Sequence, residues 1–251
     1  MMQGTYYKEW SRMLGREMEF KVYGTAGVPV LALPARGGRF YDWENNGMPE
    51  AVASLLSSGK LQLFTADGID AESLLAGDSA PRRRAEMQEK YFNYLSTELA
   101  ARIRELNQTE KGQRIWCVGV DTGACQAVNC RLRRPKLFAG AIGLSGIYDL
   151  ARFWGSEADD LVLRCSPLQY LAENGIADKL ALAKAKENSL MLCAGQGAYE
   201  DDAKADTQAL ADVLAAQGLP AHLEVWGGDV SHEWYWWGKM LGLFVPRILE
   251  K

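Results

Sequence analysis

The sequence predicts an α/β fold, in which a mostly parallel sheet is covered by helices on both faces. Short apolar runs of strand length alternate with segments of helical periodicity along most of the chain, as they do where helices connect parallel strands. Residues 115–120 and 122–133 show this most compactly, because an apolar β-branched run is followed almost at once by a helical segment. The 251 residues, 48% of them apolar, suffice for one large core, so we expect a single domain over residues 1–251.

The expected elements follow in chain order. The first strand alternates polar and apolar residues, as a half-exposed strand does, whereas most later strands are apolar throughout, as buried parallel strands are. We expect strands at residues 18–23, 28–34, 61–66, 115–120, 139–145, 189–194 and 221–226. We expect helices at residues 48–57, 82–107, 122–133, 176–186 and 203–217, and a last helix that holds Trp236 and Trp237. Residues 69–81 are expected as a loop and residues 153–171 as irregular, with a helix start at Ser166-Pro167.

Charge and composition argue against several classes of partner. The formal charge of −4 gives no long-range attraction to nucleic acid, and the run Arg82-Arg83-Arg84 is too short to outweigh it. No window has the length of a bilayer span and no signal peptide is evident, so we expect a cytoplasmic protein without a membrane partner. The five cysteines lack metal-ligand spacing and are expected to be buried free thiols. No phosphate-binding glycine motif occurs, and no metal or organic cofactor is expected.

One turn organises the chain. Gly119-Val120-Asp121-Thr122-Gly123 joins an expected strand to an expected helix, and small residues flank one central side chain. This is the outline of a nucleophile elbow, in which the central residue is usually serine. Asp121 takes that place here. It is interpreted either as a reacting carboxylate or as an ion-paired turn residue held by His232 or Arg36.

Candidate partners for Asp121 follow the late strands. The chain has only two histidines. His222 lies within an expected strand, whereas His232 lies in the loop after it and is the candidate base. Glu200, Asp201 and Asp202 follow the preceding strand, where a carboxylate either orients the histidine or offsets the dipole of the next helix.

A glycine pair, Gly37-Gly38, follows an early buried strand and leaves backbone N–H groups free to face a ligand. In a site of this kind, an oxyanion would be stabilised by the N–H groups of Thr122 and of Arg36 or Gly37. A plain loop is the alternative.

Aromatic residues near the candidate site have two interpretations. Tyr199, Tyr235, Trp234 and Trp236 are candidates for lining a pocket, with Tyr199 and Trp234 preferred. The tryptophans near the C-terminus would otherwise form a homodimer face or pack beneath the pocket, and we favour packing. Ser145 lies at a strand end without the Gly-x-Ser-x-Gly pattern of a nucleophile elbow, and we interpret it as a structural serine.

The run from Gly119 to Asp149, GVDTGACQAVNCRLRRPKLFAGAIGLSGIYD, resembles the esterase D-type branch of the α/β-hydrolase superfamily. The segments PARGGRF, GQGAYED and GGDVSHEW extend the resemblance over nearly the whole chain, in the order elbow, acid, histidine. The resemblance implies an α/β-hydrolase fold and a small-molecule, ester-like substrate or ligand; no insertion is long enough for a large cap domain. By carry-over, the catalytic positions would be Asp121, His232, and Glu200 or Asp201.

Asp121 changes the chemistry that the resemblance implies. A carboxylate that adds to an ester carbonyl leaves more readily than the alcohol, so the adduct returns to substrate and ester hydrolysis is expected to be weak or lost. A second interpretation is a catalytically inactive pseudo-hydrolase that acts as a binding or scaffold protein. A third, ranked below it, is attack of Asp121 on an epoxide or haloalkane, with His232 activating water for the second step.

Overall fold

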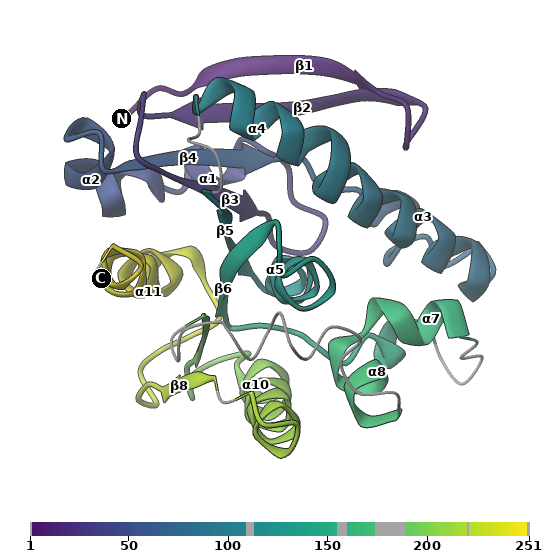
Figure 1. Ribbon diagram of the computed structural model, residues 1–251. Coiled ribbons are helices and arrows are strands. Elements are labelled where there is room, and N and C mark those ends of the chain that lie inside the picture. Colours follow the sequence, from purple (N-terminus) through teal and green to yellow (C-terminus); the bar gives the residue numbers. More distant parts are fainter. Residues whose placement is uncertain (1, 109–112, 155–159, 174–188, 220, 250–251) are drawn as a thin grey trace.

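The computed structural model describes residues 2–108, 113–154, 160–173, 189–219 and 221–249. Within these residues, eight strands form one sheet in the order β1-β2-β4-β3-β5-β6-β7-β8 (Figure 1). The strands are β1 (Thr5–Ser11), β2 (Arg16–Tyr23), β3 (Val28–Leu33), β4 (Leu61–Ala66), β5 (Ile115–Val120), β6 (Phe138–Leu144), β7 (Leu190–Ala194) and β8 (His222–Val225). β1 and β2 are antiparallel to their neighbours, and the strands from β4 to β8 are parallel. The expected mostly parallel sheet is confirmed.

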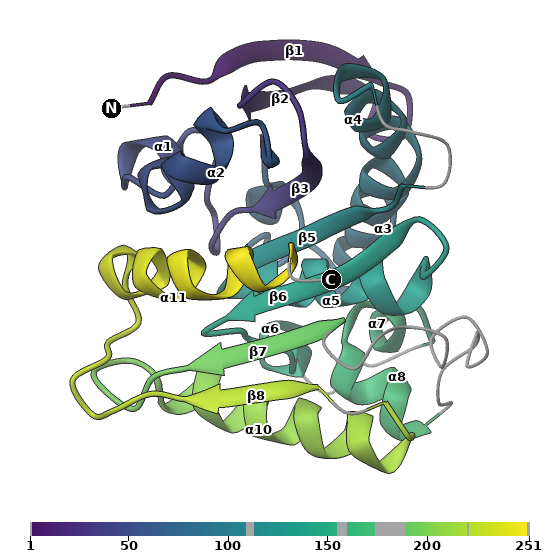
Figure 2. The ribbon, with the colours of Figure 1, turned by 60° about the vertical axis from the view of Figure 1, so that its left-hand side comes forward.

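Helices cover both faces of this sheet, as expected. The first part of the chain contributes α1 (Asp42–Asn45), the 3-10 helices η1 (Pro49–Val52) and η2 (Asp70–Glu72), α2 (Ala53–Ser57), α3 (Pro81–Asn93), the π-helix η3 (Tyr94–Leu99) and α4 (Ala100–Leu106). The second part contributes α5 (Thr122–Arg133), α6 (Ala151–Trp154), α7 (Asp160–Cys165), α8 (Pro167–Glu173), α10 (Asp201–Ala216) and α11 (Trp234–Arg247). Figures 1 and 2 show α2 and α11 on one face, and α3, α4, α5 and α10 on the other. In the described part of the chain, no separate cap domain is inserted.

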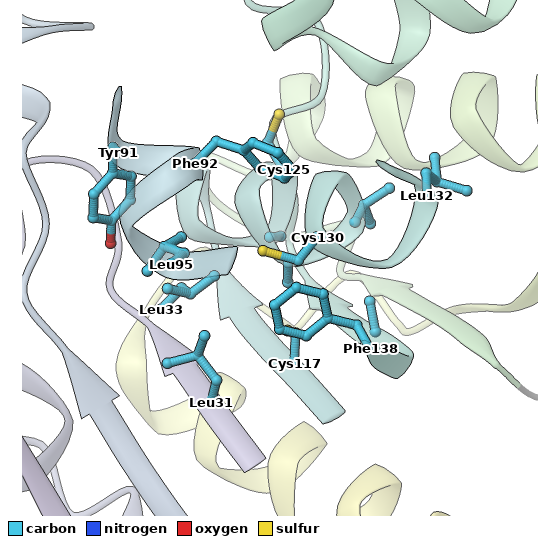
Figure 3. Packing of buried hydrophobic residues seen from close by; sticks show 14 of the residues in the cluster. Leu31, Leu33, Tyr91, Phe92, Leu95, Cys117, Cys125, Cys130, Leu132 and Phe138 are labelled. Carbon is cyan, nitrogen blue, oxygen red and sulfur yellow. The ribbon is translucent and has the colours of Figure 1, made fainter. Parts of the chain in front are cut away.

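Two apolar cores lie on the two faces of the sheet. Side chains of β3 and β5 pack against α3 and α5 on one face, where Leu33, Phe92 and Phe138 are buried (Figure 3). Trp43 and Phe244 belong to the core of the opposite face. Burying one such side chain contributes roughly 1.5–3 kcal/mol. The two cores together hold the strand ends rigidly in place.

The five cysteines are buried and free, as expected. Burial raises the pKa of the Cys117 thiol well above its ordinary value, and the nearby thiol of Cys130 raises it further. Cys117 and Cys130 face each other across β5 and α5 (Figure 3). A thiol that stays protonated is a poor nucleophile, so these side chains serve as packing groups.

The glycines of the elbow are required by close backbone contacts. A Cβ atom on Gly119 would lie 2.1 Å from the carbonyl oxygen of Gly123, and one on Gly123 would lie 2.2 Å from that of Pro34. α5 is buried along almost its whole length, because it crosses the centre of the sheet. The elbow is therefore held between β3, β5 and α5.

Some expected elements were wrong or incomplete. β1 was not expected, because its alternation of Thr, Tyr, Lys, Glu and Trp carries little apolar signal; the ring of Tyr7 nevertheless stacks on Phe20 at 4.9 Å. Residues 153–171 were expected as irregular with a helix start at Ser166-Pro167. α8 begins at Pro167, as expected, but α6 and α7 were not expected, because each is shorter than the window in which periodicity is read. The expected helix at residues 82–107 is interrupted by the π-helical turn η3. The expected helix at residues 176–186 lies outside the described residues.

Candidate functional site

An open cleft of about 610 Å³ lies at the carboxyl ends of the parallel strands. Its lining comes from the loops that follow five neighbouring strands, β3, β5, β6, β7 and β8. Figure 2 shows the strands of this half of the sheet ending at one edge, beside the loops that lead to α10 and α11. The lining residues are Arg36, Asp121, Ile147, Tyr199, Asp201, Asp202 and His232. Open α/β sheets bind ligands at this edge.

Asp121 stands at the end of β5 in a backbone conformation that favours glycine, with φ 52° and ψ −124°. Its N–H group donates to the carbonyl oxygen of Leu144 at 3.1 Å, and its carbonyl accepts from the N–H of Ile147 at 3.2 Å. Such a conformation costs about 1–3 kcal/mol and persists where the surroundings over-determine it. The sharp turn aims the side chain of residue 121 into the cleft.

Arg36 binds the carboxylate of Asp121 twice. The backbone N–H of Arg36 donates to Oδ2 at 3.1 Å, and its guanidinium Nη2 donates to Oδ1 at 3.0 Å. The guanidinium also lies over the ring of Phe153, 4.9 Å from its centroid. Asp121 is 5% exposed, and these contacts offset the cost of burying its charge. The Arg36 N–H group that was expected to face an oxyanion therefore binds the side chain of Asp121.

His232 lies between two carboxylates. Its Nε2 is 3.8 Å from Oδ1 of Asp121, and its Nδ1 is 3.6 Å from Oε1 of Glu200. Both distances exceed hydrogen-bond length. Glu200 is fully buried, whereas Asp201 is exposed at the rim. Of the two expected acids, the structure places Glu200 beside His232 and Asp201 at the cleft mouth.

Backbone hydrogen bonds join the loops that carry Glu200 and His232. The N–H of Gly197 donates to the carbonyl of Val230 at 2.8 Å, and the N–H of His232 donates to that of Ala198 at 2.9 Å. A Cβ atom on Gly197 would lie 2.7 Å from the oxygen of Val230, which explains the glycine at this position. The ring of Trp237 meets the imidazole edge-on at 4.9 Å. His232 is thus positioned by its own loop and by α11.

Ser145 was interpreted as a structural serine, and its place behind the candidate site was missed. Its hydroxyl donates to Oε1 of Glu200 at 2.5 Å, and both residues are fully buried. Ser145 follows β6, and Glu200 follows β7, the strand that pairs with β6. That adjacency of strand ends was the available signal, since the carboxyl ends of parallel neighbours meet at one edge. Ser145 holds the acid that faces His232.

Asp70 is a second missed residue, in a segment expected to be a loop. Its Oδ2 accepts from the N–H of Gly37 and from the hydroxyl of Thr122, each at 3.1 Å. Burial raises the pKa of Asp70, and the nearby charge of Asp121 adds to that effect, while these hydrogen bonds oppose it. The N–H of Gly37, expected to face an oxyanion, donates to Asp70. Asp70 joins the loop after β3 to the start of α5.

Of the two residues expected to line the pocket, Tyr199 lies at the cleft and Trp234 lies elsewhere. Tyr199 lines the cleft and is 89% exposed, with φ 63°. Trp234 was expected to line the same pocket, but it packs edge-on against Trp43 and Trp237, at centroid distances of 6.4 and 5.1 Å. It borders another hollow, of about 370 Å³, near η1 and α11. The apolar rings of α11 find partners in the core beneath the sheet edge, which is why Trp234 turns away from the cleft.

The described residues form neither a metal-binding cluster nor a membrane-spanning helix. In that part of the chain, no three His, Cys, Asp or Glu side chains are grouped so as to hold a metal ion. No helix formed by those residues combines the length and apolar character of a membrane span. His222 lies at the opposite end of β8 from the cleft. Its Nε2 atom is 2.8 Å from Oε1 of Glu224 and 2.8 Å from Nη1 of Arg247. The second histidine of the chain is therefore engaged elsewhere.

Comparisons with known proteins agree with this fold. A ferulic acid esterase structure is 18% identical over 99% of this chain and 98% of its own, with a TM-score of 0.74. An S-formylglutathione hydrolase from Agrobacterium tumefaciens is 14% identical over 98% and 94%, with a TM-score of 0.72. MPT51 (FbpC1) from Mycobacterium tuberculosis is 16% identical over 99% of each chain, with a TM-score of 0.70.

At these identities the likeness shows the fold, which is that of the α/β-hydrolases. No curated protein matches the chain. A family model described as "Putative esterase" matches residues 11–247. Because that match spans almost the whole chain, this protein belongs to the family of esterases that the model describes.

Proposed function

We propose that this protein is an esterase-family α/β-hydrolase in which ester hydrolysis is weak or lost, and whose cleft is retained to bind a small molecule. One observation carries the proposal. The carboxylate of Asp121 occupies the nucleophile position of the elbow and accepts a hydrogen bond from the Arg36 N–H group at 3.1 Å. A single side chain thus replaces the nucleophile and takes up a donor that an oxyanion would need.

Two physical effects oppose acyl transfer at this site. A carboxylate that has added to an ester carbonyl departs more readily than the alkoxide, so the adduct reverts to substrate. A negative charge fixed beside the N–H of Arg36 also repels a developing oxyanion. Loss of one oxyanion donor alone lowers the rate about 100- to 1,000-fold in other enzymes.

The surrounding groups support a site whose remaining parts are intact. His232 lies 3.6 Å from Glu200 and 3.8 Å from Asp121. Sites of this kind often have long hydrogen bonds that tighten when a ligand binds. The elbow geometry is that of a strained nucleophile turn. Serine at position 121 would therefore meet a histidine and an acid already in place.

The test is an activity comparison between the wild type and an Asp121→Ser variant on short-chain 4-nitrophenyl esters. We expect wild-type hydrolysis close to the uncatalysed rate and a gain of about 100-fold or more in the variant. An Asp121→Asn variant, which removes the charge without supplying a hydroxyl, serves as the matched control and is expected to stay inactive. His232→Ala in the Asp121→Ser background should abolish the gain.

Two outcomes would contradict the proposal. Wild-type ester hydrolysis as fast as that of the Asp121→Ser variant would show that the carboxylate does not block the reaction. Halide release or epoxide opening by the wild type, absent from the Asp121→Asn variant, would instead make Asp121 a nucleophile toward saturated carbon.

A further inference from the structure

We propose that the cleft over Asp121 binds an organic cation, namely an alkylammonium or guanidinium group on a small apolar body. The inference rests on the proposed function, because it takes the cleft as a binding site. It adds the chemical class of the ligand. Three features of the cleft carry it: the sign of its charge, an exposed aromatic ring and unpartnered buried polar atoms.

The cleft lining is acidic. Asp121, Asp201 and Asp202 supply three carboxylates, against one guanidinium from Arg36. That guanidinium is already bound to Asp121, and Asp202 is bound by Arg152 at 2.7 Å. Among the described residues, no lysine or arginine forms an ion pair with Asp201. The cleft therefore offers an incoming cation a carboxylate that, among the described residues, no cationic side chain pairs with.

Buried atoms behind the lining add to the negative potential. Glu200 is fully buried, and its Oε2 has no hydrogen-bond partner within the described structure; the same holds for Nδ1 of His232. A carboxylate removed from water acts over a longer range than an exposed one, because little solvent screens it. An anionic ligand that approached His232 would meet this field, whereas a cation would be attracted by it.

Tyr199 supplies the aromatic component. Tyr199 is 89% exposed at the cleft. Its backbone adopts φ 63°, a value that residues other than glycine rarely take. The residue lies in the loop before α10, two positions before Asp201, which begins that helix. A carboxylate beside an exposed aromatic face is the combination that binds alkylammonium groups, through charge and the ring quadrupole.

The cleft has room for such a ligand. Its volume of about 610 Å³ falls within the range of about 300–1,000 Å³ typical of small-molecule sites. Ile147 contributes an apolar contact in the lining. A ligand with an ammonium head and a short apolar tail would match both parts.

The experiment uses three probes with one tail and different heads: 4-phenylbutylammonium, 4-phenylbutanol and 4-phenylbutyrate. Each is titrated into wild-type protein that carries isotope-labelled histidine, and the two imidazole signals are followed by NMR. His232 lines the cleft, and His222 lies at the far end of β8 as an internal control. We expect the ammonium probe to shift the His232 signal to saturation, to leave His222 unchanged, and to bind about tenfold more tightly than the other two probes.

Variants locate the binding groups. Asp201→Asn and Tyr199→Ala are each expected to weaken binding of the ammonium probe about three- to tenfold, and Tyr199→Phe to preserve it. Asp212→Asn makes the same charge change at an exposed position of α10, further along the helix, and should leave the affinity unchanged. Added salt should weaken binding of the ammonium probe and not of the alcohol.

The ligand class would be overturned if the alcohol or carboxylate shifted His232 as strongly as the ammonium. It would equally be overturned if no probe shifted His232, or if Asp212→Asn weakened binding as much as Asp201→Asn. Ester hydrolysis by the Asp121→Ser variant without cation binding by the wild type would reject the ligand class alone. Cation binding together with fast ester hydrolysis by the wild type would reject the proposed function alone.

Discussion

Asp121 and Ser145 occupy matching positions at the ends of neighbouring strands, β5 and β6. Both have left-handed backbone angles, φ 52° and 46°, and both are almost fully buried. The N–H of each donates to the next strand, to Leu144 and to Cys193 respectively. At the elbow an acid stands where a hydroxyl is usual, and at the neighbouring turn a hydroxyl binds an acid. The same backbone device thus presents one side chain to the cleft and buries the other behind it.

At the sheet edge, the backbone geometry and the side-chain chemistry are set by different residues. The elbow geometry depends on glycines and on α5, whereas the carboxylate of Asp121 is hydrogen-bonded by Arg36. A change of side chain at position 121 therefore leaves the turn in place. Its partners, by contrast, are specific to charge, since Arg36 contacts the carboxylate through two donors.

The largest stability effect should come from the glycines that precede the two turns. A Cβ atom at Gly119 would meet the backbone oxygen of Gly123 at 2.1 Å, whereas one at Gly143 would meet the hydroxyl of Tyr148 at 2.0 Å. A side-chain end can move and a backbone cannot. We expect Gly119→Ala to cost about 3 kcal/mol or more and Gly143→Ala less, measured by urea unfolding. Equal costs would show that the two turns are equally rigid.

Removing the hydroxyl of Ser145 should have the next largest effect. Ser145→Ala leaves Oε1 of Glu200 without its 2.5 Å hydrogen bond, and an unsatisfied buried polar group costs about 1–3 kcal/mol. Ser145→Gly loses the same bond but relieves the left-handed backbone, so it should be the less destabilised of the two in urea unfolding. If Ser145→Ala left the free energy of unfolding unchanged, Ser145 would have no role in positioning Glu200.

Arg36→Met tests the charge pairing at the elbow. The methionine keeps much of the packing against Phe153 but cannot neutralise Asp121. Because the Arg36 side chain is 40% exposed, solvent screening limits the loss to about 1 kcal/mol. The same substitution should cost nearly nothing in the Asp121→Ser background, so a double-mutant cycle by chemical unfolding isolates the pair. Equal costs in both backgrounds would mean that the ion pair contributes no stability.

The smallest effect concerns the pH dependence contributed by Asp70. Because burial raises its pKa in the folded protein, folding binds a proton at this site, and stability falls as the pH rises above the ordinary pKa of an aspartate, about 4. Asparagine does not titrate, so the Asp70→Asn variant does not show this loss of stability. The stability of this variant relative to the wild type should therefore improve as the pH rises above about 4, as measured by urea unfolding at a series of pH values. A constant difference would contradict the raised pKa.

Sequence patterns predicted the central part of the fold well. The strand at residues 115–120 and the helix at residues 122–133 match β5 and α5 residue for residue, because a buried apolar run and a glycine turn are both local signals. Strand β1 was not predicted because the sequence of an amphipathic edge strand resembles that of a polar loop. The short helices α6 and α7 were not predicted because packing, rather than periodicity, stabilises them, whereas the start of α8 at Pro167 was predicted from Ser166-Pro167.

The same distinction holds for the site. Asp121, Glu200 and His232 were identified because each follows a strand, and the ends of parallel strands meet at one edge. Ser145 and Asp70 were missed because their roles depend on contacts 55 and 52 residues away in sequence. No local pattern marks such contacts. For Ser145 the available signal was the pairing of β6 with β7, which places its strand end beside that of Glu200.

The most direct test of the central claim is covalent labelling with a fluorophosphonate. In the Asp121→Ser variant, the new hydroxyl should attack phosphorus, with His232 taking its proton and fluoride leaving. Intact mass spectrometry should then show one adduct, mapped by peptide analysis to position 121 and not to Ser145, and no adduct on the wild type. A folded variant that stays unlabelled, or a wild type that is labelled, would contradict the claim that Asp121 alone disables an otherwise complete site.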